Sequence, residues 1–168
     1  HVLGALHENR EPALLGPYTE ENPFHEPFTL FAYLAAVTER VELCTGVIIL
    51  PQRQAVLVAK QAAEVQLLSG GRFRLGVGSG WNYVEYEAMG VPWKGRGKRV
   101  SEQIEGMRRL WSGEVVDFEG DFHRIDRAVL NPIPAQPIPV WLGAVAPPAL
   151  KRAAELGDGI LFGGSPSM

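Results

Sequence analysis

The sequence is poor in the residues that make covalent cross-links and metal sites. It contains a single cysteine, Cys44, which excludes an internal disulfide. None of its four histidines has ligand spacing with a cysteine or a carboxylate, so we predict no metal site. Because Cys44 lies in an apolar run, we expect a small buried core residue there. The low cysteine content also fits a reducing, cytoplasmic setting.

An excess of charge of one sign is missing, and so are long apolar runs. With 16 basic and 19 acidic residues, the formal net charge is −3, which gives no field that attracts nucleic acid or an anionic membrane. No apolar run approaches the roughly 18 residues of a membrane span. The chain opens on His1 without a signal-peptide pattern. We therefore expect a cytoplasmic protein that binds neither nucleic acid nor membranes.

Glycine and apolar residues are plentiful, and they are combined in the stretch LLSGGRFRLGVGSGW, residues 67–81. This stretch predicts the end of a helix, a tight glycine turn, a buried strand over residues 72–77 and a glycine-rich loop. The loop, residues 78–80, exposes backbone amides at the carboxyl end of the strand. In α/β folds, ligands bind at that end.

The chain before this stretch predicts a long loop over residues 4–26, a helix over 27–39, a strand over 41–50 and a helix over 54–68. We place four apolar residues on one face of the second helix: Val56, Ala59, Ala63 and Leu67. The strand, helix, strand order implies parallel strands joined by a right-handed crossover.

The chain after the stretch continues the same alternation. We predict an insertion over 81–97 with a short helix over 82–89, then a helix ending near Trp111 and a hairpin over 115–125. A stiff connector over 131–139 leads into a short strand up to Ala144. A helix over 147–157 and a strand over 159–162 follow, and the strand ends in Gly163, Gly164 and Ser165. His123 in the hairpin is expected to face solvent. Four parallel strands separated by helices fit either an open doubly wound sheet or a (β/α) barrel.

Two glycine-containing loops could hold an anion. Residues 76–80 resemble the dinucleotide fingerprint, but Trp81 replaces its last glycine, so we favour a phosphate contact from the amides of Ser79 and Gly80. A second loop, residues 143–146, directly precedes a helix that starts at Pro147, where free amides and the helix dipole favour phosphate. Together they suggest one phosphate held from two sides. Tight turns that need glycine for geometry alone are the other interpretation.

Two further features allow two interpretations each. Gly46 inside a strand indicates a bulge, which either satisfies packing or lets a flat aromatic cofactor approach the backbone. The basic run over residues 94–99 is expected to be a flexible solvated loop, or else a clamp for an anionic cofactor tail.

Three segments, residues 38–81, 85–111 and 137–161, resemble the luciferase-like monooxygenase superfamily, and within it the oxidoreductases that depend on the deazaflavin coenzyme F-420. The resemblance implies an α/β fold, the (β/α)8 TIM barrel of the bacterial-luciferase type. A complete barrel has eight strands and about 250 residues. The chain, with four predicted strands, then corresponds to the central part of the barrel, a single partial domain over residues 1–168.

The resemblance also implies roles for individual residues. Gly46 and Val47 match a bulge, often with a non-proline cis peptide, behind the central ring of the coenzyme. Ser79 and Gly80 match the loop at its ribityl phosphate, and Gly143, Ala144 and Val145 match the opposite phosphate loop. His1 matches a catalytic histidine beside the reactive ring carbon. Trp81 stands where some relatives carry an acidic residue, which argues against a sugar-phosphate dehydrogenase.

The function implied is hydride transfer between coenzyme F-420 and an unidentified small organic substrate. Two alternatives stay open: an FMN-dependent monooxygenase of the same fold, and a non-catalytic flavin-binding relative. The resemblance further implies a homodimer, and it leaves the substrate unspecified.

Overall fold

The computed structural model describes residues 1–162 and contains one parallel sheet with helices around it. The strands are β1 (Leu43–Cys44), β2 (Ile48–Ile49), β3 (Phe73–Gly78), β6 (Val140–Gly143) and β7 (Gly159–Leu161). Their order is β1–β3–β6–β7, and β2 also pairs with β3. All these pairs are parallel, as the sequence predicts, and the predicted first strand is split into β1 and β2.

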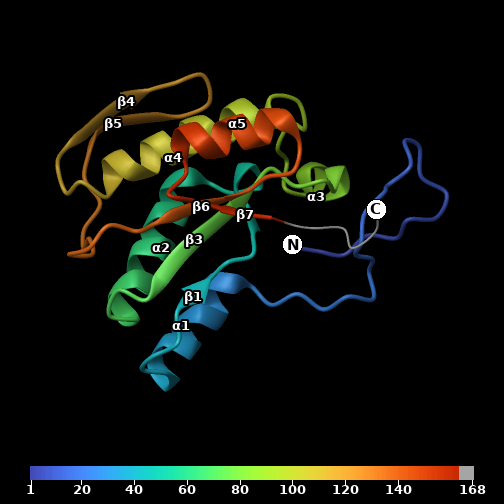
Figure 1. Cartoon of the computed structure of the whole chain (residues 1–168). Coiled ribbons are helices and arrows are strands. Elements are labelled where there is room, and N and C mark those ends of the chain that lie inside the picture. Colours follow the sequence, from blue (N-terminus) through green and yellow to red (C-terminus); the bar gives the residue numbers. More distant parts are fainter. Residues whose placement is uncertain (163–168) are drawn as a thin grey trace.

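Helices cover the outside of this sheet in sequence order. These are α1 (Pro27–Val37), α2 (Ala55–Leu68), α4 (Arg96–Leu110) and α5 (Pro147–Leu156). In Figure 1, α1 lies below the sheet, α2 on its left, and α4 and α5 above it, while the strands point to the right. This repeated strand and helix arrangement is a segment of a (β/α) barrel, and it confirms the predicted fold class.

Shorter elements lie at the margins of the barrel segment. A 3-10 turn, η1 (Leu50–Gln52), follows β2, and α3 (Tyr83–Ala88) lies beyond the carboxyl end of β3. Residues 1–26 form no helix or strand and run past α3 on the right of Figure 1. The predicted hairpin is present as β4 (Val116–Glu119) and β5 (Arg124–Ala128), which are antiparallel.

The core lies between the sheet and the helices, with β3 at its centre. Leu75 and Val77 are completely buried, and small residues of α2, Ala59, Ala62 and Ala63, let that helix pack closely against the sheet. Of the four apolar residues predicted to share one face of α2, Ala59 and Ala63 are buried, whereas Val56 is 50% exposed and Leu67 is 38% exposed. Val56 lies one residue off the buried stripe, and Leu67 follows the last buried residue of the helix.

The structure corrects two further expectations in exposed or charged segments. Cys44 is exposed, because β1 is at the edge of the sheet and its buried neighbour Leu43 takes the face toward the helices.

The basic run over residues 94–99 is not a flexible loop, since α4 begins at Arg96 after Gly95, which has φ 77°. Arg99 is buried: its guanidinium donates to the Pro92 carbonyl at 3.0 Å and lies over an aromatic ring.

His123 is also not a free solvent-facing side chain. Its Nδ1 lies 2.7 Å from a carboxylate oxygen of Glu102 on α4, and the ring is half-buried. The same carboxylate accepts from the backbone N–H groups of Asp121 and Phe122. These bonds hold the pKa of Glu102 below its usual value, although the burial contribution alone would raise it. The contacts fasten the hairpin to α4.

Candidate functional site

The break between β1 and β2 is a bulge maintained by one side chain. The Thr45 hydroxyl donates to the carbonyl oxygen of Gly76 at 2.7 Å and accepts from the N–H of Gly76 at 2.8 Å. The side chain thereby satisfies two backbone groups of β3 that a regular partner strand would pair. The next peptide bond, Gly46–Val47, is cis, in agreement with what the resemblance implied. A Cβ on Gly46 would meet nothing within 4 Å, so open space adjoins the bulge there.

Val47 brings the two predicted phosphate loops together. A Cβ built on Gly78 would lie 2.8 Å from Cγ2 of Val47, and one built on Gly143 would lie 3.1 Å from its Cγ1. The ends of β2, β3 and β6 therefore meet around a single side chain. Gly78 and Gly143, the first residues of the two predicted loops, thus lie beside the bulge at one end of the sheet.

The backbone amides of this region are only partly hydrogen-bonded within the described residues. Ser79 and Gly80 are half-buried, and Val145 is exposed while Ala144 is buried. The Ala144 N–H donates to the carbonyl oxygen of Leu161 at 3.3 Å. Within residues 1–162, the N–H groups of Gly80 and Val145 have no acceptor. α5 starts two residues after Val145, so its positive dipole end faces the same region. Gly163, Gly164 and Ser165 lie outside the described residues.

His1 belongs to the same region and is fixed by a residue that the sequence analysis did not single out. Its Nδ1 lies 2.8 Å from Oε2 of Glu85, which is completely buried on α3. The other carboxylate oxygen accepts from the N–H of Val2 at 2.6 Å and of Leu3 at 3.3 Å. The His1 ring also packs against the rings of three aromatic residues, at centroid distances of 4.9–5.5 Å: Tyr18, Phe24 and Trp81.

The protonation of Glu85 determines the tautomer of His1. Burial by itself would raise the pKa of Glu85, but the hydrogen bonds from His1, Val2 and Leu3 outweigh it and hold the pKa below its usual value. The carboxylate is therefore ionised at neutral pH and can only accept hydrogen bonds. It follows that Nδ1 of His1 carries a proton, and in a neutral imidazole the lone pair is then on Nε2.

Glu85 was missed because its sequence context suggests a local role. Asn82 followed by Glu85 three residues later matches a capping box at the start of a helix. Asn82 does cap α3, since its side-chain oxygen accepts from the N–H groups of Val84 and Glu85. The Glu85 carboxylate instead points toward residues 1–3. The one sequence signal for a buried role of Glu85 was its position next to Tyr86, on the apolar side of a short helix.

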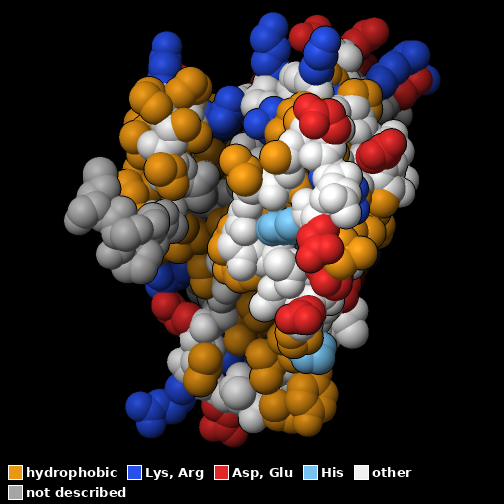
Figure 2. Space-filling view, turned by 90° about the vertical axis from the view of Figure 1, so that its right-hand side faces the viewer, with side chains coloured by type: hydrophobic (Ala, Val, Ile, Leu, Met, Phe, Trp, Pro, Cys, Tyr) orange, Lys and Arg blue, Asp and Glu red, His pale blue; other side chains and the backbone are white. Residues whose placement is uncertain are grey.

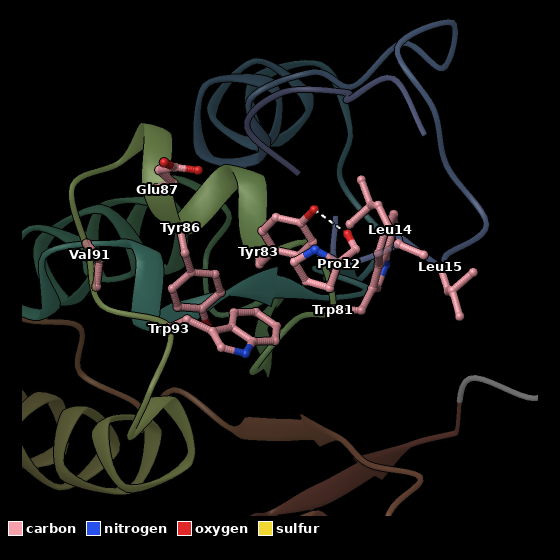
Figure 3. Close-up of a pocket in the computed structure, with 10 residues that line it drawn as sticks. Pro12, Leu14, Leu15, Trp81, Tyr83, Tyr86, Glu87, Val91 and Trp93 are labelled. Carbon is pink, nitrogen blue, oxygen red and sulfur yellow. Dashed lines mark hydrogen bonds between the residues drawn. The ribbon is translucent and has the colours of Figure 1, made fainter. Parts of the chain in front are cut away.

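A pocket of 620 Å³ lies beside these residues, between α3 and the N-terminal segment (Figure 3). Aromatic rings provide much of its wall: Trp81, Tyr83, Tyr86 and Trp93. Leu14 and Leu15 close the opposite side. The face of the molecule toward which the strands point is shown in Figure 2, where apolar side chains lie among scattered acidic ones and basic ones gather near the upper edge.

Residues 1–162 lack two other classes of feature. No group of three or more His, Cys, Asp or Glu side chains that could hold a metal ion was found there. The helices in that range are too short or too polar to cross a membrane.

Known proteins match this chain over most of its length. The family model for luciferase-like monooxygenases matches residues 12–167. The chain belongs to this family. Luciferase-like relatives include an uncharacterised protein of Mycobacterium tuberculosis, 44% identical over 88% of this chain and 51% of its own length. An F420-dependent glucose-6-phosphate dehydrogenase of Tsukamurella paurometabola is 39% identical over 83% of this chain and 44% of its own length.

A solved luciferase-like structure has the same fold. The monooxygenase RslO1 from Streptomyces bottropensis superposes with a TM-score of 0.75 at 29% identity, covering 83% of this chain and 46% of that chain. The chain thus spans about half the length of the curated relatives it matches. The luciferase-like family contains both F420-dependent oxidoreductases and monooxygenases.

Proposed function

We propose that the whole protein is an oxidoreductase that transfers hydride between a deazaflavin coenzyme, F-420, and a small organic substrate. The observation that carries this proposal is the meeting of the Gly46–Val47 bulge with the loops after β3 and β6 around Val47. Support for the deazaflavin comes from the 39% identity to an F420-dependent dehydrogenase.

The residues present fit such a coenzyme. Gly46 adjoins open space, so a flat ring system could lie against the bulge, while the loop amides and the α5 terminus suit a phosphate. Ser79, Gly80, Gly143, Ala144 and Val145 would hold the phosphate, and Gly46 with Val47 would support the ring. When bound, the deazaflavin supplies the hydride acceptor or donor.

His1 would handle the proton of the reaction. Because Glu85 keeps Nδ1 protonated, Nε2 can accept the hydroxyl proton of an alcohol as its carbon loses hydride, and it can return that proton in the reverse direction. The aromatic rings around His1 would exclude water from this transfer.

An FMN-dependent monooxygenase is the second candidate. It is favoured by the structural similarity to the monooxygenase from Streptomyces bottropensis. The same loops could hold the phosphate of FMN, so parallel titrations with the two coenzymes separate the candidates. If the protein binds neither coenzyme at about micromolar concentration, the enzyme proposal is wrong in both forms.

A charge reversal in the first loop tests where the phosphate binds. We expect Ser79→Asp to weaken coenzyme binding about ten-fold, or ~1.4 kcal/mol, because a carboxylate would lie against the phosphate. The measurement is quenching of F-420 fluorescence on titration with protein. Ser112→Asp is the matched control, since Ser112 is an exposed serine that follows the C-terminal end of α4 and is not part of either phosphate loop. An unchanged dissociation constant for Ser79→Asp would rule out this placement of the phosphate.

A further inference from the structure

The aromatic pocket adjoins both parts of the candidate site. Trp81 lines the pocket, and its ring also packs against His1 at a centroid distance of 5.5 Å. Tyr86 lines the pocket too, and its hydroxyl donates to the carbonyl oxygen of Ser79 at 2.6 Å. A molecule in the pocket would therefore lie against Trp81, whose ring adjoins His1, and against Tyr86, which contacts the loop after β3, so that a group projecting past Trp81 would reach His1.

The chemistry of the wall is apolar and aromatic. Among the ten described residues that line the pocket there is no lysine, arginine or histidine, and the one acidic side chain, Glu87, lies at the edge away from the two indole rings (Figure 3). Both phenol groups are already engaged, because Tyr83 donates to the Pro12 carbonyl at 2.6 Å and Tyr86 donates to Ser79. Burial raises the pKa of Tyr86, so its hydroxyl stays protonated.

The rings are held in fixed positions. The guanidinium of Arg96 lies 3.6 Å from the centroid of the Trp93 ring, and Tyr86 meets that ring edge to face at 5.0 Å. The backbone of Gly16 lies flat against Trp81, so closely that a side chain there would overlap the indole. The pocket is thus preformed around two indole planes, and its 620 Å³ suits a small organic molecule.

We infer that this pocket binds the substrate, and that the substrate is an uncharged molecule with an aromatic or similarly apolar body, such as an aryl alcohol or ketone. The inference rests on the proposed function for the reaction, while the binding itself can be tested without it. A sugar phosphate is disfavoured, because its phosphate would meet no lysine, arginine or histidine among the described residues that line the pocket.

The experiment is fluorine NMR of the chain labelled with fluorotryptophan, titrated with acetophenone and separately with glucose 6-phosphate. Trp81 and Trp93 report on the pocket, and Trp111 and Trp141 serve as internal controls because they do not line it. We expect saturable shifts of the first two resonances with acetophenone and none with glucose 6-phosphate. Tighter binding of glucose 6-phosphate, equal shifts of all four resonances, or no shift with acetophenone would each overturn the inference.

A pair of surface variants tests whether the residues that line the pocket are responsible for acetophenone binding. Leu15 lines the pocket and is 82% exposed, so Leu15→Glu should not disturb folding but should weaken acetophenone binding about five-fold. Leu68→Glu, at an exposed leucine at the end of α2, should leave binding unchanged. Equal effects of the two variants would contradict the inference. Coenzyme titration of the same samples separates the two proposals: coenzyme binding without acetophenone binding refutes only this one, and the reverse refutes only the proposed function.

Discussion

Gly76→Ala is expected to lower the free energy of unfolding by about 3 kcal/mol or more, or to prevent folding. A Cβ at this position would overlap the carbonyl oxygen of Thr45 and lie 2.8 Å from Cδ1 of Leu161. Relief of the overlap would move Thr45 away and break both hydrogen bonds between its hydroxyl and the Gly76 backbone. Two buried backbone groups of the central strand would then lack partners.

Urea denaturation followed by circular dichroism measures this effect, and soluble yield covers the case in which the variant does not fold. Gly106→Ala is the matched control, because a Cβ there would make only ordinary contacts, with the Phe118 ring at 3.8 Å and beyond. Gly106 lies inside α4, so alanine should raise stability by about 0.5–1 kcal/mol. A loss below about 1 kcal/mol for Gly76→Ala would show that the bulge does not depend on this close approach.

Glu85→Gln should cost about 2 kcal/mol of folding stability at neutral pH and should free the His1 ring. The buried carboxylate accepts from His1, Val2 and Leu3, and a neutral amide accepts such bonds less strongly and brings a donor toward Nδ1 of His1. With its tautomer no longer fixed, His1 should be less suited to the proton transfer proposed for it. The stability change is measured by urea denaturation of wild type and variant.

The pH dependence of this effect has a definite sign. The pKa of Glu85 in the folded chain is lowered from 4.5, so its ionised form stabilises folding above that pH, and the contribution disappears as the pH falls through the lowered value. The difference in stability between wild type and Glu85→Gln should therefore shrink below pH 4.5. For the control Glu87→Gln, an exposed substitution on the same helix, the difference in stability from wild type should not change with pH in this way. A difference that is constant with pH would contradict an ionised Glu85.

The order of strands and helices could be predicted from the sequence because it depends on local signals. Apolar runs of strand length, prolines at helix starts and glycines after strands can all be recognised in the sequence itself. The meeting of the two loops with Gly46 was also predictable, since the carboxyl ends of parallel strands lie at one edge of a sheet. The structure adds Val47 as the side chain against which both loops pack.

Features that depend on tertiary neighbours were not predictable in the same way. Cys44 was expected inside because its neighbours are apolar, but the face it takes depends on where Leu43 meets the helices. The charge of the run before Val100 suggested a loop, while Arg96 and Arg99 are helical residues that pack on aromatic rings. Glu85 matched a local capping pattern, and its partners lie more than 80 residues away in the sequence.

Residues 1–26 have no regular secondary structure, yet three of their anchors come from one short stretch. Glu85 accepts the N–H groups of Val2 and Leu3, Tyr83 binds the carbonyl of Pro12, and Trp81 supports Gly16. Two of these three anchoring side chains also line the aromatic pocket. Ordering of the segment would therefore be thermodynamically linked to the proposed binding in the pocket. A ligand that binds against Trp81 and Tyr83 would also immobilise the chain that precedes α1, and loosening of that chain would weaken the binding.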